Sequence, residues 1–112
     1  MTTITNVALV APVQLTNADV AYYTAPSATA ARISRAVFSN TTAGAVTITV
    51  NITPGSASAA GNQLINARAL AAGETYVSPE LAGAVMLPGS QIRALSSAGT
   101  SVTMMVSGVT IV

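Results

Sequence analysis

The chain has 112 residues, of which 51% are hydrophobic and only 6% are charged, and its formal net charge is +1. It contains no His and no Cys, which excludes an imidazole base, a thiolate nucleophile, a disulfide and any metal site built on these ligands. So small a net charge predicts binding neither to nucleic acid nor to an anionic membrane. The length and the apolar content fit one folded domain and not a disordered chain.

At the N-terminus, residues 1–15 are predicted to form a strand or an arm that orders on binding a partner, and residues 16–112 a β-sandwich, in one domain overall. No basic residue precedes an apolar run here, so we expect no secretory signal. The longest apolar run, residues 7–13, is far below the ~20 residues that span a bilayer, so no transmembrane segment is expected.

The strongest strand pattern covers residues 45–52, where Val46, Ile48, Val50 and Ile52 alternate with polar residues. A repeat of two with β-branched residues favours a strand over a helix, because branching at Cβ restricts the side chain in a helix.

The C-terminal residues 102–111 alternate in the same way up to Gly108, where the parity of the apolar positions shifts. We expect a β-bulge at Ser107 and Gly108, after which Val109 and Ile111 become the apolar set.

Weaker strand candidates lie between turns rich in Gly, Pro and Asn, at residues 3–10, 20–24, 32–39, 63–70, 74–77, 84–87 and 91–95. About eight short antiparallel strands at this spacing predict an all-β fold, a single β-sandwich. Jelly-roll and immunoglobulin-like topologies both stay open, because strand order is not encoded in periodicity. A short helix at residues 65–72 is an alternative, and residues 56–62 are predicted to be a surface loop.

The carboxylates are Asp19, Glu74 and Glu80. Glu74 and Glu80 flank a predicted strand, and glycoside hydrolysis needs two carboxylates at a set gap. We nevertheless expect each to be solvated or paired with an arginine beside its turn. The serines have no His or Lys to activate them, and one isolated Asp does not make a calcium site. No catalytic residue, metal ligand or cofactor is therefore predicted, and a small hydrolase or lyase is disfavoured.

All four basic residues are arginines, Arg32, Arg35, Arg68 and Arg93, and they are predicted interface residues, because the planar guanidinium suits protein contacts. Arg32 and Arg35 have opposite parity on their strand, so they are expected on different faces unless a bulge intervenes.

Tyr22 and Tyr23 are adjacent, which places one ring on each face of a strand. One ring is predicted to join the core. The other is a candidate interface anchor or sugar-stacking platform.

The predicted outward strand positions are Thr, Ser, Ala and Asn instead of charged residues. Ordinary domains carry about 25% charged residues, and small side chains lose little rotamer entropy on burial. This surface composition favours a subunit of a larger assembly.

Three segments carry a resemblance to a known group of proteins: YYTAP with ARISRAVFSNT, then LAAGETYV, and finally PGSQIRAL with VTMMVSGVTI. They resemble small phage virion structural proteins of the head-decoration or capsid-cement type, over residues 22–112. The chain departs from that group at Ser90 and Gln91, where an acidic residue is common, and in its long loop at residues 54–62.

The resemblance implies a β-sandwich in a phage particle, with no catalytic signature to carry over. We therefore expect a non-enzymatic capsid decoration or cement protein, a homo-oligomer such as a trimer that contacts the major capsid protein. It would be located in the virion and assembled in the bacterial cytoplasm. The alternative is a tail, neck or fibre component that binds host glycans.

Overall fold

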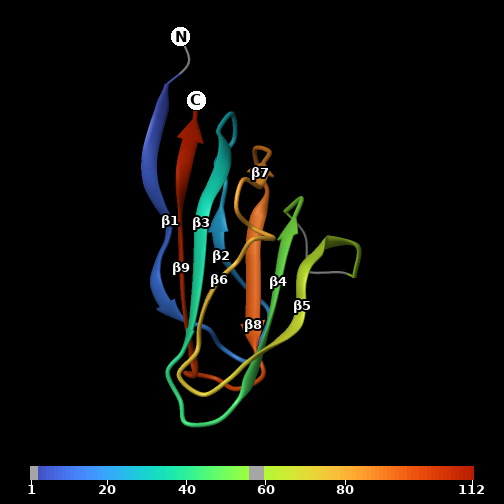
Figure 1. Ribbon diagram of the computed structural model, residues 1–112. Helices are drawn as coiled ribbons and strands as arrows, with labels where there is room; N and C mark the ends of the chain where they lie inside the picture. Colours follow the sequence, from blue (N-terminus) through green and yellow to red (C-terminus); the bar gives the residue numbers. More distant parts are fainter. Residues whose placement is uncertain (1–2, 56–59) are drawn as a thin grey trace.

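The structure, a computed structural model, describes residues 3–55 and 60–112. These residues form two antiparallel sheets that pack face to face (Figure 1). The strands are β1 (Ile4–Gln14), β2 (Val20–Thr24), β3 (Ala30–Asn40), β4 (Val46–Thr53), β5 (Gln63–Leu70), β6 (Thr75–Val77), β7 (Val85–Met86), β8 (Gln91–Ser96) and β9 (Val102–Ile111). A short 3-10 turn, η1 (Ala60–Asn62), precedes β5.

Sheet A has the order β1-β9-β3-β6, with β7 also paired to β3, and sheet B has the order β2-β8-β4-β5. The chain pairs its first half with its second half: β1 with β9, β2 with β8, β3 with β6 and β7, and β4 with β5. These pairs alternate between the two sheets, so the fold is one long hairpin rolled into a sandwich. Both chain ends therefore lie at the same end of sheet A (Figure 1).

The core consists of the side chains that face inward from both sheets. The largest fully buried ones are Leu15, Ile33, Phe38, Ile48, Val50, Leu70, Leu81, Met86, Ile92, Val102, Met104 and Val106. Burying one such side chain stabilises a fold by about 1.5–3 kcal/mol relative to leaving it exposed. The predicted alternation is confirmed at Val46, Ile48 and Val50 in β4 and at Val102, Met104 and Val106 in β9, which are all buried.

The all-β sandwich predicted from the sequence is confirmed, with nine strands in the described residues where about eight were expected. Residues 63–70 form β5, so the alternative of a helix there is wrong. Pairing of β5 with β4 outweighs the helix propensity of its Ala, Leu and Arg residues. Of the predicted surface loop at residues 56–62, positions 56–59 lie outside the described residues.

Several strands are longer than predicted. β1 continues past Pro12 to Gln14, and Pro12 is tolerated because β1 is an edge strand with a register shift between Val10 and Val13. β3 extends at both ends, to Ala30 and Asn40. Pairing with β9 along its whole length stabilises these ends.

The bulge predicted within β9 lies instead in its two neighbours. β9 stays in continuous register with the partners on both sides, while β1 holds an extra residue, Leu9, and β3 holds an extra residue, Ser34. Gly108 keeps its inward parity but has no room for a side chain: an added Cβ would lie 2.1 Å from the carbonyl oxygen of Arg32. Val109, opposite Arg32, is buried at 8% exposure, so its predicted place among the buried apolar positions is confirmed, although it lies apart from the main core cluster. Ile111, the other residue of that predicted set, is only partly buried.

Candidate functional site

Arg93, a predicted interface residue, is held within sheet B. Its Nε donates to the Oδ2 of Asp19 at 2.8 Å, and its Nη1 donates to the Oε1 of Gln91 at 2.9 Å. The Arg93 and Asp19 side chains are partly exposed, at 19% and 27%. Arg93 thus binds the turn before β2 through Asp19 and its own strand, β8, through Gln91.

Arg68 also makes a contact within the molecule. Its guanidinium carbon lies 3.9 Å from the ring centroid of Tyr76, so the two form a cation–π pair between β5 and β6. The Tyr76 hydroxyl donates to the carboxylate of Glu80, 2.6 Å from Oε2. Burial raises the pKa of Tyr76, and the hydrogen bond to Glu80 raises it further.

Arg32 and Arg35 lie together on the outer face of sheet A. The extra residue Ser34 shifts the register between Ile33 and Arg35, so both arginines are exposed while Ile33 and Ala36 are buried. The sequence predicts different faces for Arg32 and Arg35 unless a bulge intervenes, and the structure has such a bulge between them. Within residues 3–55 and 60–112, no carboxylate pairs with either arginine.

Tyr22 and Tyr23 both pack against the core cluster and are half-buried. The register shift between Ala21 and Tyr23 breaks the alternation that placed one ring on each face. The Tyr22 hydroxyl accepts a hydrogen bond from the Thr16 N–H at 3.2 Å. Burial raises the pKa of Tyr23, and neither ring stands out as a free platform.

Glu74 and Glu80 have separate local partners. The Ala71 N–H donates to the Oε1 of Glu74 at 2.7 Å, which closes the turn before β6. Glu80 accepts from Tyr76 and from the Ser78 hydroxyl, the latter at 3.3 Å. The two carboxylates thus serve different turns, and no described contact joins them into an acid–base pair.

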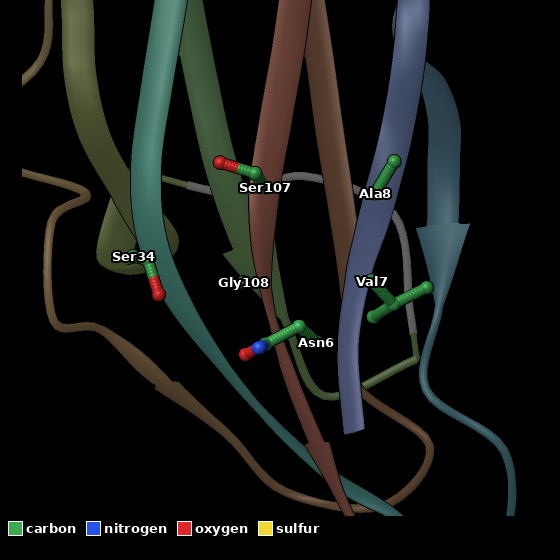
Figure 2. A pocket seen from close by; sticks show the side chains of 6 residues that line it. All are labelled: Asn6, Val7, Ala8, Ser34, Ser107 and Gly108. Atoms are coloured by element: carbon green, nitrogen blue, oxygen red, sulfur yellow. The ribbon is translucent and has the colours of Figure 1, made fainter.

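A hollow of about 440 Å³ lies where β1, β9 and β3 run side by side (Figure 2). Its lining residues are Asn6, Val7, Ala8, Ser34, Ser107 and Gly108. The Asn6 and Ser34 side chains point toward each other across β9, whereas the Val7 side chain points away (Figure 2). The lining therefore combines two hydroxyls and one amide with small residues.

The register places the two outer-face arginines beside this hollow. Ser107 of β9 is opposite Ala8 on one side and Arg35 on the other. Two residues along, Val109 is opposite Asn6 and Arg32. The hollow and the arginine pair are thus parts of one surface, called here the bulge surface: Asn6, Ala8, Arg32, Ser34, Arg35 and Ser107.

The sequence did not predict the hollow, because its lining residues come from three separate strands and none of them belongs to a recognisable motif. The parity shift at Gly108 was the one signal that pointed to it.

Exposed apolar side chains lie around the bulge surface at the same end of sheet A. Ile4 is 66% exposed and is opposite Ile111. Val85 is 63% exposed and is opposite Arg32, and Leu87 is 68% exposed. Charged residues are therefore few and apolar contact area is plentiful on this part of the molecule.

In the described part of the chain, the acidic side chains do not gather into a group of three that would hold a metal ion. None of the described residues forms a helix long and apolar enough to cross a membrane.

The sequence matches no protein-family model and no curated protein sequence. Solved structures do match the fold. A chain in the structure of infectious bursal disease virus, Gx strain, superposes with a TM-score of 0.54 at 14% identity, over 99% of this chain and 32% of that chain. A chain from the Gt strain gives a TM-score of 0.50 at 10% identity, over 98% of this chain and 32% of that one. The present chain thus spans about a third of those chains, and at such identities the likeness shows a shared fold.

Proposed function

We propose that this chain is a non-enzymatic structural protein of a virus particle. The observation that carries the proposal is the fold, which superposes on a chain of a virus structure over 99% of the present chain with a TM-score of 0.54. Two sheets with the orders β1-β9-β3-β6 and β2-β8-β4-β5 fit a jelly roll, a double-sheet fold that recurs in viral capsid domains. An immunoglobulin-like domain does not pair its first strand with its last in this way.

More narrowly, the proposed role is a decoration or cement protein of a phage head. The turn and strand segments at residues 22–112 that resemble such proteins support this role. The protein would sit as a homo-oligomer, a trimer in the simplest case, where major capsid subunits meet in the virion assembled in the bacterial cytoplasm. A protein that binds only the assembled shell stabilises that shell by mass action, without chemistry.

The bulge surface and the apolar residues around it are the proposed contact area. Arg32 and Arg35 have no carboxylate partner among the described residues, whereas Arg68 and Arg93 are engaged within the molecule. Interfaces favour arginine together with apolar area, which this end of sheet A offers.

A tail, neck or fibre component that binds glycans is the second candidate. It needs an exposed aromatic ring, yet Tyr22 and Tyr23 pack on the core and Tyr76 is covered by Arg68. No observation favours this candidate over the first.

The test is the copy number of the chain in purified particles, measured by quantitative mass spectrometry against the major capsid protein. We expect a ratio within a few-fold of the capsid protein. A handful of copies per particle would favour the tail, neck or fibre. Absence of the chain from the particle would overturn the proposal.

A further inference from the structure

We infer that the bulge surface docks an acidic segment of a partner protein, with one carboxylate seated in the hollow between Arg32 and Arg35. The inference gives the chemistry of the partner for the surface proposed above, and so rests on that proposal. It begins from an imbalance of charge within the chain. Asp19 binds Arg93, Glu74 binds the Ala71 N–H, and Glu80 binds Tyr76. In the described part of the chain, each acidic side chain therefore already has a partner, and none forms an ion pair with Arg32 or Arg35.

The bulge in β3 brings these two charges to one face. If Ser34 were a regular strand residue and not the extra residue of a bulge, strict alternation would turn Arg35 to the face opposite Arg32. With the bulge, both arginines lie on the face of the hollow, at the register of Ser107 and Val109. The hollow itself offers the hydroxyls of Ser34 and Ser107 and the amide of Asn6 (Figure 2). Guanidinium, hydroxyl and amide groups are all donors to a carboxylate, and the guanidinium matches its geometry with two parallel bonds.

The surroundings favour a protein segment over a nucleic acid. Nucleic-acid binding relies on many phosphate contacts, and two free arginines on a chain of net charge +1 supply few. Exposed apolar side chains accompany these polar groups, with Ala8 on the bulge surface and Val85 and Ile4 beside it. A peptide with acidic and aliphatic side chains complements both the charge and the apolar area.

The experiment titrates the full chain with a peptide that alternates Glu and Val, followed by amide chemical shifts in NMR. The matched probe is the same peptide with Gln in place of Glu. We expect saturable shifts at Asn6, Ser34 and Ser107 with a Kd of about 1 mM or tighter. Binding by the Gln peptide should be at least tenfold weaker, and added salt should weaken binding by the Glu peptide.

Variants assign the binding to the two arginines. Arg32→Gln together with Arg35→Gln should weaken binding of the Glu peptide at least tenfold. Each single variant, Arg32→Gln or Arg35→Gln, is compared with Arg68→Gln, which also removes one positive charge, but at an edge of sheet B, and should change the affinity less than twofold. Each variant is checked by its amide spectrum, so that loss of binding is not confused with loss of the fold.

Four results would overturn the inference. These are no saturable shift with the Glu peptide, equal binding of the Gln peptide, unchanged binding by the double variant, and inorganic phosphate or an oligonucleotide occupying the same residues more tightly than the peptide. A negative titration beside a high copy number in particles would leave the structural role standing and remove only the acidic partner.

Discussion

The guanidinium carbon of Arg68 lies 3.9 Å from the ring centroid of Tyr76. Arg68 belongs to β5, an edge strand of sheet B, and Tyr76 to β6, an edge strand of sheet A. The Tyr76 ring stacks in turn on Phe38, with centroids 6.5 Å apart, and Phe38 is fully buried. A column of three side chains thus joins the core to the surface and closes one open side of the sandwich.

Replacing Arg68 with Gln is expected to lower the free energy of unfolding by about 0.5–1 kcal/mol, because an exposed cation–π contact is worth that much. Urea unfolding of Arg68→Gln, Tyr76→Leu and the double variant measures the coupling between the two residues. Arg35→Gln serves as the control, since it removes an equally exposed arginine that has no such contact. Additive losses in the cycle would mean that the contact contributes nothing.

Alkaline pH is expected to destabilise the protein through Tyr76. Burial and the hydrogen bond to Glu80 raise the pKa of Tyr76 above its ordinary value of about 10. Above that pH the unfolded chain loses the phenolic proton first, so stability is full below pH ~10 and falls as the pH rises toward the folded pKa. Burial raises the pKa of Tyr23 too, which adds to the same trend.

Urea midpoints between pH ~9 and ~11 test this sign. Tyr76→Phe should flatten the decline, since one of the two shifted phenols is gone. A midpoint that rises with pH in the wild-type chain, or the same slope in Tyr76→Phe, would contradict the assignment to Tyr76.

Asn40 is expected to be a sensitive position for stability. Its side chain is 1% exposed, and its Nδ2 faces the carbonyl oxygens of Gly44, Leu70 and Ala71 at 2.8, 3.2 and 3.0 Å. Its Oδ1 accepts from the Thr42 N–H at 3.0 Å. This amide therefore ties the end of β3 in sheet A to the end of β5 in sheet B.

Asn40→Ala should cost about 2–4 kcal/mol, because it leaves buried carbonyl groups unpaired. Asn40→Asp should cost at least as much, since a carboxylate cannot donate to those carbonyls. Thermal or urea unfolding provides the measurement, with the exposed Asn17→Ala as the control expected within about 0.5 kcal/mol of wild type. Equal stability of Asn40→Ala and Asn17→Ala would refute the role given to Asn40.

Gly108→Ala is expected to be strongly destabilising. Its Cβ would lie 2.1 Å from the carbonyl oxygen of Arg32 and 3.0 Å from the Cδ1 of Leu9, so backbone of β3 would have to move. Forced overpacking of this kind costs about 1–3 kcal/mol or more. Gly99→Ala is the matched control, because nothing lies within 4 Å of its added Cβ. A melting temperature for Gly108→Ala equal to that of Gly99→Ala would show that the bulges relax freely.

The side-chain pattern of β9 predicts its buried positions but not the location of the bulges beside it. The alternation of Val102, Met104 and Val106 predicted their burial correctly, because a strand turns successive side chains to opposite faces. The parity slip at Gly108 was read correctly as a sign of a bulge, but the extra residues belong to β1 and β3. The pattern of apolar residues in a strand indicates which of its side chains face the core. It does not indicate which of the paired strands holds the extra residue of a bulge.

The sequence predicts only part of the bulge surface. Arg32 and Arg35 were predicted as interface residues, yet their common face depends on Ser34, whose role appears only when β3 is paired with β9. Arg68 and Arg93 are also predicted interface residues. In the structure, however, Arg68 contacts Tyr76 and Arg93 forms an ion pair with Asp19, so both are engaged within the molecule. These partners are distant in the chain or join different sheets, so no local pattern signals them.

By itself, the sequence determined the all-β class, the position of most strands, and the absence of His and Cys chemistry, because side-chain periodicity and residue type are local properties. The tertiary structure alone decided the strand order, the two bulges that flank Gly108, and the placement of Arg32 and Arg35 beside one hollow. The physical reason is that these features arise where three strands from the two ends and the middle of the chain meet. Their geometry follows from steric fit between segments that are neighbours only after folding.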